Sequence, residues 1–294
     1  MNNENYQELQ RAFEESWNEG RSKGGDKALF WDSRAHEWAA NMDSDRQTQE
    51  RTAARVGATV EYFLRKGILH DKAEIIDIGC GLGRFVLEFA KHAGHVIGSD
   101  ISLEMLKYAA GYAKNEGLKN VSYVPCDFKE FDPKALGWER RFDLVFASIT
   151  PVVYGDGLDK FMSMSKKWCF NSSFVRREDA FMDRMLSEIF GTDANGTRDA
   201  SWNRYYTLSN VLMLRGYLPE ITYYKEGKQK TFKADMESAK NLAIDAKQRV
   251  NKKIEEMQEP IFEYLKENAD ENGNISINDT VTYAWTLWDV SKKV

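Results

Sequence analysis

The sequence predicts an α/β fold built on a mainly parallel sheet. From about residue 73 onward, short apolar runs alternate with amphipathic segments, which is typical of βα units. Three glycines stand where the first apolar run meets the next amphipathic segment, in the stretch IIDIGCGLGRF at residues 75–85. The 294 residues suffice for one elaborated domain or two small ones.

The predicted strands are the short apolar runs. Five of them come early, at residues 73–78, 95–100, 121–126, 142–148 and 167–175. Two more come late, EITYYK at 220–225 and TVTYAWTLWDV at 280–290. In the last run the residues Val281, Tyr283, Trp285 and Leu287 share one face, which indicates a half-buried antiparallel strand.

The predicted helices connect these strands and extend the fold. Residues 1–70 have helical spacing on both sides of the Gly24-Gly25 pair, and we expect them to form an N-terminal helical lid. Residues 71–294 form the main domain, in which Ser102 caps one crossover helix. Two helical insertions are expected, at about 176–200 and about 234–270, and Pro260 is expected to interrupt the second.

Composition narrows the classes of partner. The net charge of -5 argues against a nucleic-acid substrate, because such proteins usually carry a basic surface. The three cysteines and four histidines lack the spacing of a metal site, so no metal is expected. The chain has no apolar run near the ~18 residues of a membrane span and no apolar leader, so we expect a cytoplasmic protein without a membrane partner.

The spacing of the glycines distinguishes between cofactors. A turn rich in glycine between a strand and a helix lets a ligand approach the main chain closely. Gly79, Gly81 and Gly83 form a G-x-G-x-G pattern, whereas a dinucleotide fingerprint would need its third glycine at position 84, which is Arg84. A nicotinamide-dependent oxidoreductase therefore becomes the weaker alternative.

The four strand ends resemble the motifs of class I S-adenosylmethionine-dependent methyltransferases. The stretch IIDIGCGLGRF, with Asp77 at the end of its strand, is similar to motif I of that family. VIGSDIS, VSYVPCDF and RFDLVFASITP follow in the order and at the spacing of the later motifs. The resemblance is strong over about residues 70–175 and looser toward the C-terminus.

The resemblance implies a role for each matched residue. Asp77, Gly79, Gly81 and Gly83 would hold the methionine end of the cofactor, together with Ala147. Asp100, followed by Ile101, would bind the ribose hydroxyls, and Asp127 with Phe128 would bind the adenine.

The resemblance also implies a fold and an activity. The fold would be a seven-stranded, mostly parallel Rossmann-like methyltransferase sheet with an antiparallel last strand. The activity would be methyl transfer from S-adenosyl-L-methionine to a small or medium-sized acceptor by in-line displacement, at an O, N, S or C atom. A binding module that holds S-adenosylmethionine without catalysis is the second alternative.

The acceptor site is less constrained by the sequence. The candidates for a base or an orienting group are Tyr154, Asp156, His36 and Tyr205. Tryptophans such as Trp31 could wall an apolar pocket. The segment ITPVV lacks the Pro-Pro-aromatic pattern usual in the family members that methylate the amines of nucleobases, which also argues against a nucleic-acid acceptor.

Overall fold

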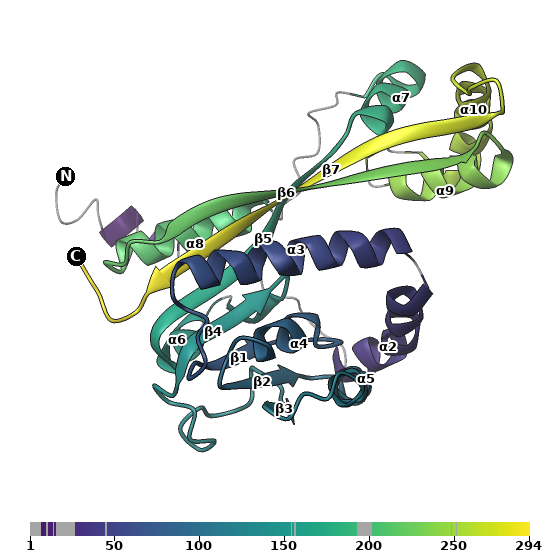
Figure 1. Cartoon of the computed structure of the whole chain (residues 1–294). Helices are drawn as coiled ribbons and strands as arrows, with labels where there is room; N and C mark the ends of the chain where they lie inside the picture. Colours follow the sequence, from purple (N-terminus) through teal and green to yellow (C-terminus); the bar gives the residue numbers. More distant parts are fainter. Residues whose placement is uncertain are drawn as a thin grey trace. The chain divides into compact units, whose positions relative to one another are not determined.

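The computed structural model describes residues 7–9, 11–13, 15, 27–44, 46–153, 155, 157–192, 202–247, 249–250 and 252–294 (Figure 1). They form two compact units. The first contains residues 1–174, 203–224 and 284–294, and the second contains residues 175–202 and 225–283. The lid role expected for residues 1–70 stays a prediction.

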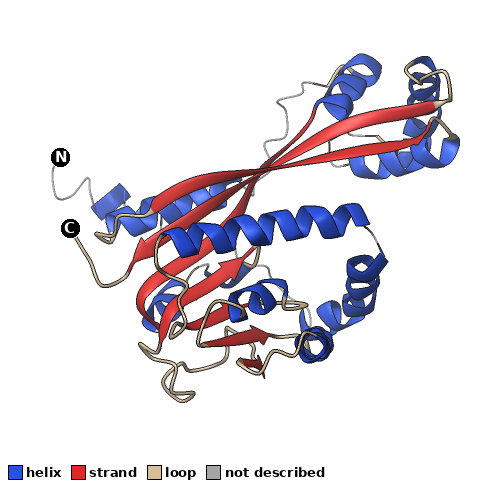
Figure 2. Ribbon diagram, in the orientation of Figure 1, coloured by secondary structure: helices blue, strands red, loops and turns tan. Residues whose placement is uncertain are grey.

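The strands form one seven-stranded sheet with the order β3-β2-β1-β4-β5-β7-β6 (Figure 2). Their bounds are β1 Glu74–Ile78, β2 His95–Asp100, β3 Val121–Pro125, β4 Phe142–Ser148, β5 Ser165–Asp179, β6 Glu220–Lys233 and β7 Asn274–Asp289. The pairs β3/β2, β2/β1, β1/β4 and β4/β5 are parallel, and the last strands are antiparallel. The predicted fold class is therefore confirmed, and β5, β6 and β7 are longer than predicted because they continue into the second unit.

Helices of the first unit cover both faces of the sheet (Figure 1). The helices of this unit are α2 Lys27–Ser44, α3 Arg46–Arg65, α4 Arg84–Ala90, α5 Leu103–Asn115, α6 Gly157–Ser163 and α8 Trp202–Leu214, with a short 3₁₀ helix at Pro151–Val153, and α2 packs against α5 rather than on the sheet. Ser102 caps α5 as predicted, since its hydroxyl accepts a hydrogen bond from the amide of Met105 at 3.1 Å.

Phenylalanines join α3 and α4 to one face of the sheet. The ring of Phe63 on α3 lies 5.0 Å from that of Phe170 and 5.8 Å from that of Phe89. Phe146 and Phe170, on neighbouring strands, stack with ring centroids 5.0 Å apart. On the other face, α6 and α8 contribute Phe161 and Leu208 to a second core cluster that includes Val145 and Cys169. The alternation of β4 and β5 residues between the two faces places the core on both sides of the sheet.

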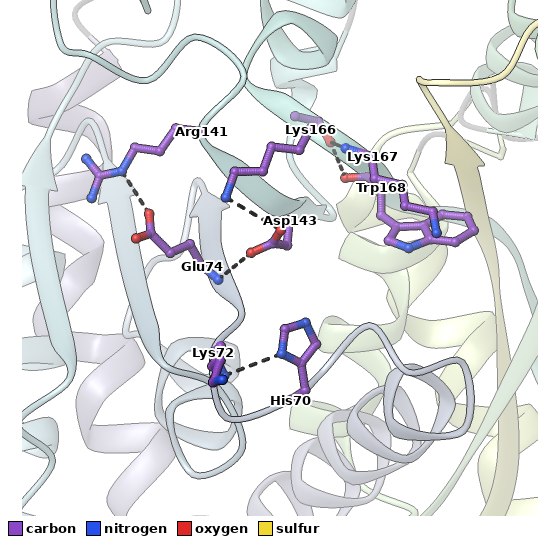
Figure 3. Close-up of polar contacts among 9 residues, drawn as sticks. His70, Lys72, Glu74, Arg141, Asp143, Lys166, Lys167 and Trp168 are labelled. Carbon is purple, nitrogen blue, oxygen red and sulfur yellow. Dashed lines mark hydrogen bonds and ion pairs between the residues drawn. The ribbon is translucent and has the colours of Figure 1, made fainter.

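Ion pairs and hydrogen bonds hold the amino edge of the sheet (Figure 3). The carboxylate of Asp143 accepts a hydrogen bond from the amide of Glu74 at 2.9 Å and lies 3.6 Å from the ammonium of Lys166. The carboxylate of Glu74 pairs with the guanidinium of Arg141 at 3.0 Å. These contacts tie the start of β1 to the starts of β4 and β5, and they leave the opposite, carboxyl edge for the site.

The second unit has a hydrophobic core of its own. It contains the helices α7 Ala180–Phe190, α9 Met236–Ala246 and α10 Ile254–Glu267, at the two expected insertions. The expectation that Pro260 interrupts the helical segment was wrong, because Pro260 lies inside α10. The buried face of α10, made of Met257, Ile261, Tyr264 and Leu265, packs in this core and outweighs the missing backbone hydrogen bond.

Phe63 connects α3 to three other aromatic rings and is fully buried. We expect Phe63→Ala to lower the free energy of unfolding by about 3–5 kcal/mol, since it removes a large core side chain and leaves a cavity. Urea denaturation measures this change. The neighbouring Leu64 is 42% exposed, so Leu64→Ala serves as the control and should cost less than about 1 kcal/mol. Equal losses in the two variants would contradict the assignment of Phe63 to the core.

Candidate functional site

The turn between β1 and α4 requires its three glycines. Gly79, Gly81 and Gly83 have φ angles of 75°, 54° and 77°, a region that other residues rarely adopt. A Cβ at Gly79 would lie 2.7 Å from the hydroxyl oxygen of Thr150, and one at Gly83 would lie 2.9 Å from the Cβ of Ala109. The glycine loop, residues 79–83, is thus closely packed between the loop after β4 and helix α5.

Asp100, the last residue of β2, binds the glycine loop. One carboxylate oxygen accepts a hydrogen bond from the amide of Gly81 at 2.8 Å, and the other accepts one from the amide of Ser102 at 2.9 Å. Burial raises the pKa of Asp100, although these bonds oppose the increase. The carboxylate therefore sits at the carboxyl edge of the sheet in a defined position, with lone pairs left for a ligand.

Asp77 lies under the glycine loop and is only 1% exposed. Its Oδ2 atom has no hydrogen-bond partner among the described residues. Burial, together with the nearby charge of Asp100, raises the pKa of Asp77 well above its usual value. Beside it lies Tyr123, whose buried hydroxyl is also unpartnered in the described structure and whose pKa is raised, chiefly by burial. Tyr123 was not predicted, because nothing in a strand pattern distinguishes it from a packing residue.

The turn after β3 holds Asp127 and Phe128. Asp127 is exposed, and its carboxylate accepts a hydrogen bond from the amide of Lys129 at 2.9 Å. Phe128 is 8% exposed because its ring packs in the core against Phe131 and Phe161. Lys160 on α6 holds this turn: its ammonium donates to the carbonyl oxygens of Phe128 and Lys129 at 2.9 and 2.8 Å. Sequence reasoning missed Lys160, which lies 32 residues away from Phe128 and belongs to no motif.

The end of β4 brings Ala147 and the following loop to the same edge. Ala147 is fully buried, and Thr150 contacts the glycine loop at Gly79. Between them, Ile149 has a φ of 56° and is 52% exposed. Such an angle is strained for a β-branched residue and is often found at functional sites. Its amide donates to the carbonyl oxygen of Ser172 on β5 at 2.8 Å.

Helix α2 packs on the glycine loop and α5. The carboxylate of Asp32 accepts hydrogen bonds from the hydroxyl of Ser102 at 2.5 Å and from the amide of Glu104 at 3.2 Å. These bonds, chiefly the one from Ser102, lower the pKa of Asp32. The loop residue Leu82 is buried in a cluster with Ala35 and Ala39 of α2. Helix α2 therefore packs at this edge.

The predicted acceptor-site residues are less concentrated than the predicted cofactor residues. His36 lies on α2 with its Nδ1 atom 3.0 Å from the hydroxyl of Tyr108. Tyr205 lies on α8 with its ring 6.0 Å from that of Tyr223, and burial with this neighbour raises the pKa of Tyr205 to about 12. Tyr154 and Asp156 lie outside the described residues. The rings of Trp31 and its neighbour Trp38 on α2 contact at 5.5 Å.

The described residues contain neither a metal-binding cluster nor a membrane-spanning helix. In that part of the chain, histidine, cysteine and carboxylate side chains form no group of three that could hold a metal ion. Within the same residues, every helix is too short or too polar to cross a membrane.

Known proteins resemble this chain over the region of the site. Residues 69–188 match a family model described as a methyltransferase domain. An uncharacterized Haemophilus influenzae protein is 23% identical over 199 residues, which cover 66% of each chain. The 23S rRNA (uracil(1939)-C(5))-methyltransferase RlmD of Francisella tularensis subsp. novicida is 34% identical over 76 residues, or 26% of this chain and 16% of that enzyme. The alignments thus span just under two thirds of the first relative and less than a fifth of the second.

A solved structure has the same fold. Magnesium protoporphyrin IX methyltransferase from Synechocystis PCC 6803, with bound SAH (S-adenosylhomocysteine), superposes with a TM-score of 0.51 at 18% identity. The match covers 68% of this chain and 93% of that one. The superposition shows the shared fold, and the family match assigns residues 69–188 to a methyltransferase domain. The family match over residues 69–188 supports a class I S-adenosylmethionine-dependent methyltransferase.

The buried Asp77 predicts a specific dependence of stability on pH. Because its pKa in the folded state is above the unfolded value of 3.8, the folded state binds the proton more tightly. The contribution of Asp77 is therefore full below pH 3.8 and is lost as the pH rises toward the folded pKa. Asp77→Asn removes this dependence, so the variant should gain stability over the wild type as the pH rises. Urea denaturation of both proteins from below pH 3.8 to neutrality measures the difference, and a constant difference would contradict the prediction.

Proposed function

We propose that this chain transfers a methyl group from S-adenosyl-L-methionine to a small or medium-sized acceptor. The observation that carries the proposal is the position of Asp100. Its carboxylate bridges the glycine loop and the start of α5 through the amides of Gly81 and Ser102. A carboxylate at this place, one strand away from the glycine turn, suits the two hydroxyls of a ribose.

The remaining cofactor contacts follow the carboxyl edge of the sheet. We assign the methionine end to Asp77, the glycine loop and Ala147, and the ribose to Asp100 with Ile101. We assign the adenine to the turn of Asp127 and Phe128. The ring of Phe128 packs in the core, so Phe128 would contact the adenine through its main chain, which Lys160 holds in place.

The chemistry makes modest demands on the protein. The cofactor supplies a methyl group on a positively charged sulfur, which is already a good leaving group. The protein must mainly exclude water and hold the acceptor in line with this methyl group, and such positioning can supply much of the rate enhancement. A rigid glycine loop, closed by Asp100 and packed against Thr150 and α2, supports this role.

The acceptor is the open part of the proposal. The net charge of -5 favours a small molecule over a nucleic acid, and the similarity to the rRNA enzyme covers only a short segment. Arg84 counts against a nicotinamide-dependent oxidoreductase: it occupies the third glycine position of a dinucleotide fingerprint, and its guanidinium donates to the hydroxyl of Thr52 on α3 at 3.0 Å.

Thermal unfolding with and without ligands tests the proposed cofactor. We expect S-adenosylhomocysteine to raise the midpoint of unfolding and NADH to leave it unchanged, since a ligand stabilises only the state that binds it. Stabilisation by NADH alone would favour the oxidoreductase. Binding of S-adenosylhomocysteine without methyl transfer to any acceptor would favour the non-catalytic module.

Asp100→Ala tests the ribose assignment. The lost hydrogen bonds are charge-assisted and worth ~1.5–3 kcal/mol each, so the affinity for S-adenosylhomocysteine should fall at least about tenfold. Isothermal titration calorimetry measures it, and circular dichroism checks the fold. Asp143→Ala is the control, because Asp143 is a carboxylate on the amino edge of the same sheet (Figure 3). Unchanged affinity in a folded Asp100→Ala protein would remove the ribose assignment.

A further inference from the structure

β5 becomes polar on one face in its middle, beside the carboxyl end of β4. Cys169 and Asn171 alternate with residues of the opposite face, and the register pairs Cys169 with Val145 and Asn171 with Ala147. The side chain of Asn171 is 2% exposed in total, and its Nδ2 atom donates to the hydroxyl oxygen of Ser173 at 2.7 Å. Its Oδ1 atom is buried and has no partner among the described residues. The side-chain amide of Asn171 therefore lies beside the carboxyl end of β4, with its Oδ1 atom unpartnered in the described structure.

A second buried oxygen of the same kind lies on β7. Thr286 is fully buried, and its hydroxyl is unpartnered in the described structure. β7 is the neighbour of β5, and the amide of Val290 donates to the carbonyl oxygen of Lys167 at 2.8 Å. Cys169 and Trp288 belong to one core cluster, and Asn171 and Thr286 each lie two residues away from them along their strands, so both side chains are on that face of the sheet. Two buried oxygens without partners in the described structure thus share one face of neighbouring strands, at a cost to stability.

The strained residue Ile149 is bonded through its backbone to the residue next to Asn171. Its amide bonds Ser172, the neighbour of Asn171, and its side chain is exposed. Thr150, the next residue, contacts the glycine loop at Gly79. The polar part of β5 is therefore separated by one strand, β4, from the strand that leads into the loop to which we assign the methionine end of the cofactor.

We propose that Asn171 and Thr286 form a polar subsite for the methyl acceptor, with Ile149 as its apolar wall. None of the three side chains is charged, and the open amide atom is a hydrogen-bond acceptor. The subsite therefore fits a neutral molecule with an apolar body and an O–H or N–H group that donates to Oδ1 of Asn171. This inference rests on the proposed function for its placement beside the cofactor.

Phenol and toluene are matched probes for this subsite, because they share a ring and differ in the donor group. Nuclear magnetic resonance of the ¹⁵N-labelled protein with S-adenosylhomocysteine follows the side-chain amide of Asn171, which is identified by its loss in Asn171→Asp. We expect phenol to shift this signal and toluene to leave it in place. The side-chain amide of Asn120 is the internal control, because it donates to the carbonyl oxygens of Ala90 and Ala93 at 2.8 and 2.9 Å. No shift with phenol, or equal shifts with both probes, would overturn the subsite.

Two variants separate binding from structure. Asn171→Leu removes the amide and should weaken phenol binding about tenfold, the usual effect of losing a hydrogen bond to a buried group. Thr286→Val keeps the shape and removes the unpartnered hydroxyl, so it should weaken phenol binding while its melting temperature stays equal or rises. A lower melting temperature with unchanged phenol affinity in Thr286→Val would show a merely structural hydroxyl and overturn its assignment.

The titration with S-adenosylhomocysteine distinguishes the two proposals. We expect Asn171→Leu and Thr286→Val to bind it as the wild type does, within twofold, because neither residue is assigned to the cofactor. If the wild-type protein does not bind S-adenosylhomocysteine, the proposed function fails. The comparison of phenol with toluene is then repeated without S-adenosylhomocysteine, and its result still tests the subsite.

Discussion

The site depends on one constraint, which is the closure of the turn between β1 and α4. Three residues of this turn have positive φ angles, so only glycine fits them without strain. The turn is held from the next strand, where the Asp100 carboxylate accepts the amide of Gly81, and from the loop after β4, where Thr150 touches Gly79. Each neighbouring strand end is thereby placed relative to the same loop. A displacement of this turn would disturb the contacts of Asp100 and Thr150 at the same edge.

The sequence was informative wherever a local pattern requires a particular conformation. Alternating apolar runs predicted all seven strands, and the spacing of the glycines predicted a turn that only glycine can adopt. Sequence patterns predict less where contacts between distant segments determine the structure. The proline of α10 is tolerated because an apolar helix face packs in a core that no local signal reveals. Lys160 and Tyr123 were missed for the same reason, since their contacts join segments far apart in the chain.

The amino edge of the sheet contains paired charges, whereas the proposed site lies at the carboxyl edge. At the amino edge the charged groups are paired: Glu74 bonds Arg141, and Asp143 bonds both the amide of Glu74 and Lys166. At the carboxyl edge one buried oxygen of Asp77 and one of Asn171 lack partners in the described structure, and Ile149 is strained. Unpaired buried groups cost about 1–3 kcal/mol each. The unpartnered oxygens of Asp77 and Asn171 keep that cost at the carboxyl ends of β1 and β4, where a ligand can remove it.

Two asparagines of the first unit illustrate the difference between a structural and a binding amide. Asn120 donates both of its amide hydrogens to the carbonyl oxygens of Ala90 and Ala93, near the end of α4. Its side chain thus stabilises a turn, and both of its donors have partners. Among the described residues the side chain of Asn171 bonds only Ser173, two residues along its own strand, and β5 is already paired with β4 through its backbone. A strand residue that adds nothing to the sheet could be apolar at no cost to folding. An amide at such a position, beside the loop where the methyl group would be presented, is better explained by what it binds than by what it supports.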